Sequence, residues 1–270
     1  MGTTGFVAPT CEPTRTADTR WLAYGRWPLL RLRPDGPPDS SFSDDGRWVA
    51  PSTHTTGVGV AVDVRRDGQV VVAAEGSHAY GTTEGDMMIW QLTAAGTPDP
   101  AFSGDGFATI DFDGGAADYP SGMRLSGGKV VVAGSSSKNG KGSLAVARLT
   151  RRGRLDRTFS ENGKRLWGLR GHDAVAHAVT VDGYGRVVVT GSLRARRTIS
   201  ETRYEHRVSW VIARFRSNGT LDDSFSGNGV ARPMWETIQD WGQSVVEQPD
   251  GQLVFGGTIY GRHGILRLKP

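Results

Sequence analysis

Apolar and polar positions alternate over short segments along most of the chain, and no long stretch carries apolar residues at helical spacing. From Gly106 to Phe112 the alternation is typical of a half-buried strand. Apolar segments at residues 119–125, 129–134 and 143–149 predict three more strands, separated by glycine-rich turns and polar loops. The pattern therefore predicts a unit of four antiparallel strands, here called A to D in chain order.

Strands C and D recur along the chain. Strand C is a continuous apolar run, as a strand covered on both faces requires, and it returns at residues 69–73, 186–190 and 252–256. Strand D returns at residues 28–33, 88–92, 211–215 and 265–268. An Asp-Gly turn precedes strand C at Asp67-Gly68 and Asp250-Gly251, and it favours a hairpin because glycine takes a positive φ without a Cβ clash.

The phrase Asp-x-x-Phe-Ser-x-(Asp/Asn)-Gly occurs four times, and its phenylalanines, 60, 57 and 66 residues apart, are Phe42, Phe102, Phe159 and Phe225. Self-similarity at such a period indicates a repeat architecture. Four antiparallel strands per repeat predict an all-β fold, a β-propeller with four-stranded blades. We expect one domain of five blades with the first shortened; four blades plus an N-terminal hairpin is the alternative. The expected blades span about residues 5–36, 46–96, 106–153, 163–219 and 229–270.

Three phrases together resemble the bacterial delta-60 repeat family. They are the Asp-x-x-Phe-Ser turn, the Asp-Gly-(Lys/Gln/Arg)-x-Val-Val-Ala-Gly run before and within strand C, and the Ala-Arg-Leu ending of strand D. The resemblance covers about residues 28–270 and implies a tandem-repeat β-propeller, but no established reaction. Gln91 departs from it, because the other strand D segments carry arginine there, at Arg31, Arg148, Arg214 and Arg267.

The repeated phrase itself has two interpretations. Carboxylates in a glycine-rich turn are suitable calcium ligands, but the last acidic position is Asp45, Asp105, Asn162 and Asn228. Exchange of aspartate for asparagine favours a hydrogen-bonded Asx turn, so we expect no metal and no cofactor. The strand D arginines are expected to pair with the recurrent Asp39, Asp99, Asp156 and Asp222; a ring of arginines around an anionic ligand is the alternative.

Function is expected where the repeats differ, in the A–B and C–D loops at one end of the sheets, because binding residues tend to lie on loops over a rigid scaffold. The C–D segment 193–207 holds five arginines and two glutamates, and arginine suits carboxylates and phosphates. Aromatic rings in other loops offer stacking surfaces. The candidate ligand-binding residues are Trp235, Trp241, Arg194, Arg196, Arg197, Tyr204, His206 and Tyr119.

Two other functional classes remain open. One is a hydrolase-type or lyase-type enzyme at the axial mouth, with His172, Asp173, Asp118 and Asp240 as catalytic candidates from different blades. This hypothesis requires those groups to converge on one pocket. The other is a fragment of a longer repeat array.

The composition says more about possible binding partners than about possible reactions. The net charge is +4 and the pI about 9.4, which is compatible with an acidic protein, peptide or glycan. The aromatic platforms that bind single-stranded nucleic acid are sparse, so we expect no nucleic acid. Short apolar runs predict no membrane insertion, and the lone Cys11 allows no internal disulfide. The N-terminus has no signal-peptide pattern, which leaves bacterial cytoplasm and a trimmed secreted protein both open.

Overall fold

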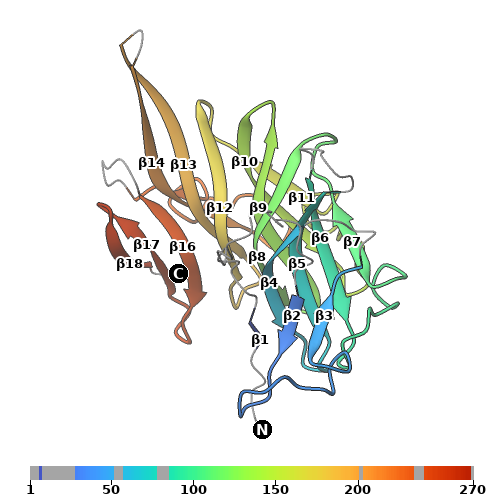
Figure 1. Ribbon diagram of the computed structural model, residues 1–270. Helices are drawn as coiled ribbons and strands as arrows, with labels where there is room; N and C mark the ends of the chain where they lie inside the picture. Colours follow the sequence, from blue (N-terminus) through green and yellow to red (C-terminus); the bar gives the residue numbers. More distant parts are fainter. Residues whose placement is uncertain are drawn as a thin grey trace, which may run out of the picture.

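A computed structural model describes residues 6–7, 28–51, 57–77, 85–200, 203–233 and 240–268. These residues form strands in five antiparallel sheets and contain no helix, so none of them forms a helix that could cross a membrane (Figure 1). The all-β prediction and the four-stranded antiparallel sheets are confirmed.

The sheets follow one another in chain order. The first has three strands: β1 (Phe6–Val7), β2 (Pro28–Arg31) and β3 (Arg47–Val49). The second has β4 (Gly57–Val64), β5 (Val70–Ser77), β6 (Gly85–Leu92) and β7 (Phe107–Ile110). The third has β8 (Ala117–Ser126), β9 (Lys129–Lys138), β10 (Lys141–Leu149) and β11 (Lys164–Trp167). The fourth has β12 (His172–Val181), β13 (Val187–Ser200), β14 (Arg203–Phe215) and β15 (Val230–Ala231). The last described sheet has β16 (Trp241–Glu247), β17 (Leu253–Ile259) and β18 (Arg262–Leu268).

Strand A pairs differently from the expected grouping. The segment at 107–110 was expected to open the unit 106–153, but as β7 it pairs with β6 of the preceding unit, with Ala108 opposite Ile89. Strands β3, β11 and β15 pair backwards in the same way. The Asp-x-x-Phe turn reverses the chain directly after strand D, so the next strand lies beside strand D. Each four-stranded sheet therefore joins strands B, C and D of one repeat to strand A of the next.

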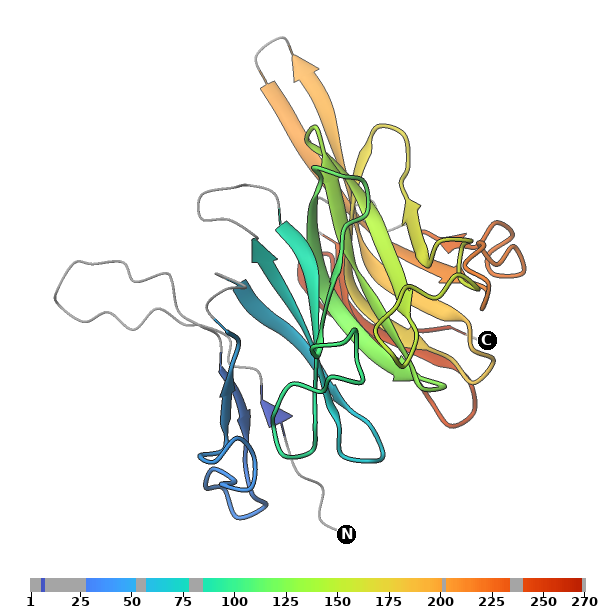
Figure 2. The same ribbon diagram turned by 90° about the vertical axis from the view of Figure 1, so that its right-hand side faces the viewer.

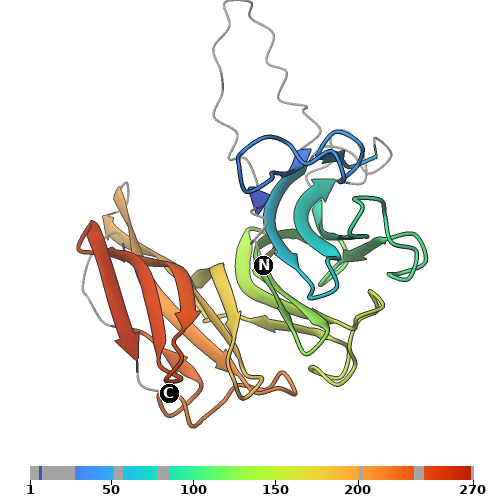
Figure 3. The ribbon, with the colours of Figure 1, turned by 90° about the horizontal axis from the view of Figure 1, so that it is seen from below.

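The sheets stack face to face in an arc, with the first and last sheets at its two ends (Figure 3). Strands β4, β8, β12 and β16 lie on the inner side, where neighbouring sheets contact one another. One apolar cluster fills each of the four seams between consecutive sheets. In β9 the alternation serves two seams at once, because Val130 and Val132 face one cluster while Val131 faces the next.

The last sheet is covered on one face only within the described chain. Leu253 and Phe255 are buried against the fourth sheet, whereas Val246 is 54% exposed and Ile265 is 79% exposed. This sheet also has three strands where four were expected, because the segment expected as its first strand pairs with β14 of the fourth sheet as β15.

The repeated phrase forms a polar unit at the end of strand D. The Nε of Arg148 lies 2.7 Å from Oδ2 of Asp156, and Nη2 donates to the Thr158 hydroxyl at 2.9 Å. The guanidinium also covers the ring of Phe159, at 4.8 Å from its centroid. Equivalent ion pairs join Arg31 to Asp39 at 2.9 Å and Arg214 to Asp222 at 2.8 Å. The predicted pairing is thus confirmed for these three arginines; Arg267 bonds Asp250, outside the repeated phrase.

The second repeat replaces this ion pair. The amide of Gln91 donates to Asp99 at 2.9 Å, and its oxygen accepts from Nε of Arg65 at 3.0 Å. Arg65 also donates to the Gly128 carbonyl in the next sheet at 2.8 Å. Arg65, directly after β4, thus supplies the positive charge that Gln91 lacks.

The Asx-turn interpretation of the phrase is confirmed by its hydrogen bonds. Each terminal Asp or Asn accepts the N–H two residues ahead, at 2.8 to 3.0 Å: Asp45 from Arg47, Asp105 from Phe107, Asn162 from Lys164 and Asn228 from Val230. Three of the four phrases also bond the turn that follows strand D of the next repeat, through the N–H groups of Ser43, Ser103 and Ser160. The Ser103 N–H, for example, donates to the Arg152 carbonyl at 2.9 Å, and the Phe102 ring packs under Gly153.

Candidate functional site

The variable segments gather at one end of the sheets, here called the loop face. It holds the links β7–β8 and β11–β12 and the hairpin ends of β9–β10, β13–β14 and β17–β18. The repeated phrase lies at the opposite end, here called the crossover face. On the loop face the β13–β14 hairpin projects beyond all other strands in two perpendicular views (Figures 1 and 2).

The β13–β14 hairpin is a two-stranded ribbon beyond the sheet. Its pairing continues to Ser200 opposite Arg203, whereas β12 accompanies β13 only as far as His172 opposite Ala195. The register places the candidate positions 194, 196, 204 and 206 on one face of the ribbon, since Arg196 pairs with His206. Position 197 lies on the other face, opposite Glu205. The ribbon thus brings together four of the five candidates on this hairpin.

Trp241 lies at the foot of this ribbon. The N–H of Asp240, the residue before it, donates to the Val208 carbonyl at 3.1 Å, and Val208 pairs with Arg194. Asp173 faces Arg194 from the other side, in β12. One row across two sheets therefore carries Asp173, Arg194, Val208 and the start of β16. The candidate Trp235 lies outside the described residues.

The four catalytic candidates bond to separate segments. The Asp173 carboxylate accepts the Gly142 N–H at 3.3 Å, and Nδ1 of His172 lies 3.2 Å from the Arg170 carbonyl. Asp240 accepts the Tyr260 N–H at 2.7 Å, and Asp118 accepts the Phe112 N–H at 2.7 Å. Within the described chain they form no tight group of titratable side chains with one another. Their convergence on one pocket stays a prediction.

Asp118 and Asp240 share a distinctive environment. Each lies two residues before the β-bulge of an innermost strand and is almost fully buried. Among the described residues, each also has one carboxylate oxygen without a hydrogen-bond partner. Burial raises the pKa of Asp118, and the nearby carboxylates of Asp111 and Asp86 raise it further, against the lowering effect of its hydrogen bonds. Tyr119, the next residue, is 37% exposed.

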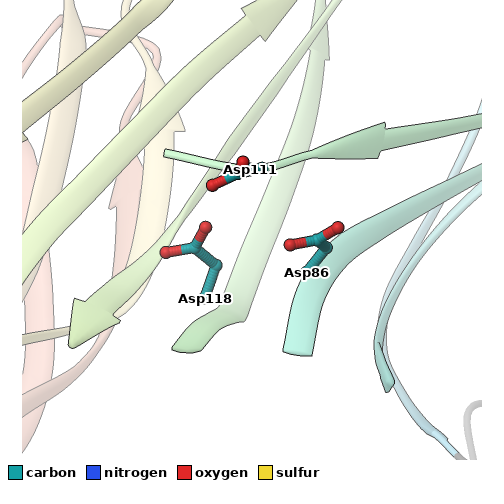
Figure 4. Close-up of side chains that lie close together, drawn as sticks. All are labelled: Asp86, Asp111 and Asp118. Carbon is teal, nitrogen blue, oxygen red and sulfur yellow. The ribbon is translucent and has the colours of Figure 1, made fainter. Parts of the chain in front are cut away.

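Two carboxylates missed in the sequence meet Asp118. Asp86 is the second residue of β6, at its loop end, and Asp111 directly follows β7. Because β7 pairs with β6, with Met87 opposite Ile110, the register places Asp86 beside Asp111. β8 brings Asp118 to them from the neighbouring sheet (Figure 4). One oxygen of each residue lies within 4.8 Å of the others. The only sequence signal was their place at strand ends, because the contact depends on how two sheets pack.

Other features lie apart from this face or inside the sheets. A hollow of about 780 Å³ lies beside the repeated phrase of the third sheet, at the crossover face, and includes Arg154, Arg157 and Lys164 in its lining. His177, at the bulge of β12, has its pKa lowered by burial, and its Nε2 lies 3.0 Å from the Ser192 hydroxyl. Neither the lining of the hollow nor the His177–Ser192 contact includes a predicted candidate residue.

Comparison with known proteins supports the fold. A family model described as a domain of unknown function (DUF5122) beta-propeller matches residues 126–159 and 201–225. These segments contain strands β9, β10 and β14 and two copies of the repeated phrase up to its phenylalanine. The match covers less than half of the chain and supports a β-propeller fold, in agreement with the antiparallel sheets. Comparison with curated proteins finds no match.

Solved structures similar to this chain are distant in sequence. MPT-4, a mannose phosphorylase from Leishmania mexicana in complex with phosphate, is 10% identical with a TM-score of 0.44, over 88% of this chain and 73% of that one. MPT-1, a GDP-Man-dependent mannosyltransferase from the same organism, is 11% identical with a TM-score of 0.38, over 77% and 66%. The GH32 beta-fructofuranosidase BmSUC1 from Bombyx mori is 14% identical with a TM-score of 0.40, over 86% and 52%.

Proposed function

We propose that this chain is a binding β-propeller that holds an acidic protein, peptide or glycan against its loop face. The ligand contacts one face of the β13–β14 ribbon and the Trp241 region at its foot. The observation that carries this proposal is the ribbon itself, which projects beyond every other hairpin and carries most of the predicted binding residues.

In the fold, the stacked sheets and the proposed binding ribbon are separate parts of the molecule. Among the described strands, β12 pairs with β13 as far as Ala195, and beyond it β13 pairs with β14, so this part of the ribbon extends past the sheet. The bond between Asp240 and Val208 fixes its foot to the neighbouring sheet. The sequence of the ribbon is rich in arginine, and the planar fork of a guanidinium group matches carboxylates and phosphates.

The experiment uses two defined acidic probes, poly-L-glutamate for peptides and polygalacturonate for glycans, with binding followed by isothermal titration calorimetry. The double variant Arg194→Ala/Arg196→Ala removes two charges from one ribbon face. We expect it to weaken binding at least about tenfold, the equivalent of one charge-assisted hydrogen bond. Binding by the unchanged protein should also weaken as salt rises.

The matched control removes charge from the opposite end of the molecule. The double variant Arg33→Ala/Arg151→Ala deletes two exposed arginines near the crossover face, which pair with Asp35 and Asp67. It should bind both probes as the unchanged protein does. Equal weakening by this control would reduce the effect to net charge, and absence of binding to both probes would reject the acidic ligand.

An enzyme at the loop face is the second candidate, and the raised pKa of Asp118 is the observation in its favour. That carboxyl has no exposed surface, however, so a substrate would reach it only after the surrounding loops move. Analysis of the products after incubation with each probe separates the two functions: binding without turnover of either probe supports binding, and turnover supports an enzyme.

A further inference from the structure

We propose that Asp86, Asp111 and Asp118 form a divalent-cation site that takes Ca²⁺. The site lies at the loop face, in the seam between the second and third sheets (Figure 4). It is separate from the repeated turns that the sequence offered as calcium candidates, and it departs from our expectation of no metal. It is also independent of the proposed function.

Asp118 supplies the observation that requires a partner. Its side chain has no exposed surface, and Oδ2 accepts the Phe112 N–H. The Ser136 hydroxyl lies close enough to lower the pKa of Asp118, but its geometry leaves Oδ1 without a hydrogen-bond partner within the described chain. A buried carboxylate oxygen without a partner is costly. The carboxylates of Asp86 and Asp111 lie beside it and add repulsion instead of compensation. A cation held between the three would satisfy the oxygen and remove the repulsion.

The ligand set suits calcium better than magnesium. The three ligand oxygens lie within 4.8 Å of one another and all come from carboxylates of the chain. Mg²⁺ is usually held by one or two carboxylates and keeps several waters, whereas Ca²⁺ takes several carboxylates in a flexible shell. Three oxygens also leave coordination positions for water, which Ca²⁺ accepts readily in its flexible shell.

The nearby lysines bond elsewhere. Nζ of Lys164 donates to the Asp111 carbonyl at 2.5 Å, so it contacts the backbone beside the cluster. Nζ of Lys138 pairs with Asp113 at 3.0 Å. The Asp111 carboxylate is oriented by the N–H groups of Asp113 and Gly114, which bond its Oδ1.

The next seam shows that the fold does not require these carboxylates. Alignment of the sheets on their bulges and strand pairs places Ser143, Gly168 and Ala174 at the positions of Asp86, Asp111 and Asp118. A Cβ added to Gly168 would lie 3.2 Å from the Ser143 hydroxyl, so these two positions are adjacent there as well. One seam is closed by small residues, and the other carries three acids in the same places.

The first experiment is calcium titration of the EDTA-treated chain, by calorimetry and by thermal unfolding. Saturating Ca²⁺ should bind with one-site stoichiometry and raise the Tm by about 5 °C. Magnesium at the same concentration should give a smaller shift. Asp118→Asn should weaken calcium binding at least about tenfold, because ligand charge sets affinity in such sites.

Two further variants keep the test decisive. Asp113→Asn removes an exposed carboxylate from the same link and should bind calcium as the unchanged protein does. The triple variant Asp86→Ser/Asp111→Gly/Asp118→Ala copies the next seam, so it should fold and show no calcium response. No saturable binding by the unchanged protein, or an undiminished response in Asp118→Asn and the triple variant, would overturn the site.

Discussion

The two ends of the sheets treat buried charge in opposite ways. At the crossover face Asp156 and Asp222 are buried, and each meets an arginine, a hydroxyl and a backbone N–H. At the loop face Asp118 and Asp240 are equally buried, but each accepts one backbone N–H and has one oxygen that no hydrogen bond from the described residues reaches. The buried carboxylates of the crossover face are thus satisfied within the chain, although Nη1 of Arg214 and Nη2 of Arg65 have no hydrogen-bond partner among the described residues. The loop face instead leaves carboxylate oxygens that an external partner could satisfy.

Within one repeat, this difference separates the residues that join one sheet to the next from the residues proposed to bind. The same polar unit recurs at the crossover face because each sheet must be joined to the next in the same way. No such demand acts on the loop face, where equivalent positions carry aspartate in β8, alanine in β12 and aspartate before β16. Changes at the crossover face should therefore act mainly on stability, and changes at the loop face mainly on binding.

The largest effect is expected at Asp222. Its removal as Asp222→Ala leaves the Arg214 guanidinium buried without its carboxylate, which should lower the free energy of unfolding by about 3–5 kcal/mol. Urea unfolding measures the loss. The neighbouring Asp223→Ala is the control, because Asp223 forms an exposed pair with Arg216 and should cost less than about 1 kcal/mol. Equal losses in both variants would show that the buried pair is not special.

A smaller loss should follow from blocking the lock between repeats. Gly219 has φ +83°, and a Cβ there would lie 2.7 Å from the Ser160 nitrogen of the preceding repeat's phrase. Gly185 has φ +75°, but its nearest neighbour would be 4.0 Å away. Both alanine variants incur about 1–2 kcal/mol of backbone strain, and Gly219→Ala should lose about 1–3 kcal/mol more from the clash. Matching urea midpoints for the two variants would contradict this account of the lock.

Local patterns in the sequence predicted the framework well. The apolar run of strand C requires cover on both faces, and β9 has it. The Asp/Asn exchange at the end of the phrase predicts an Asx turn, and all four copies form one. The partner of strand A was assigned wrongly, because an alternating segment pairs equally well with the strand before it or after it. Only the tight reversal after strand D decides between them.

The loop face could be predicted only in part. Asp118 was a candidate, but its neighbours Asp86 and Asp111 come from a different sheet, and their contact depends on the packing of two sheets. The ribbon was recognisable from the length and arginine content of segment 193–207, but which positions share a face follows from the β13–β14 register. Sequence patterns thus describe pairing within a repeat better than contacts between repeats.

The smallest effect sharpens the comparison through pH. Burial alone would raise the pKa of Asp222, but the bonds of this carboxylate to Ser224 and Arg214 hold its pKa below the usual value. The Asp222 carboxylate therefore stabilises the fold at pH values above its unfolded pKa, and this stabilisation is lost as the pH falls through the folded pKa. The pKa of Asp118 is raised, so in calcium-free buffer its carboxyl favours the fold when protonated and destabilises it as pH rises through the folded pKa.

Asp118→Asn keeps an acceptor for the Phe112 N–H without the charge. In EDTA it should be more stable than the unchanged protein by about 1 kcal/mol at about pH 8, and the gain should shrink towards about pH 4. Urea unfolding at both pH values measures this, and a variant less stable at about pH 8 would mean that the Asp118 charge is already compensated within the chain.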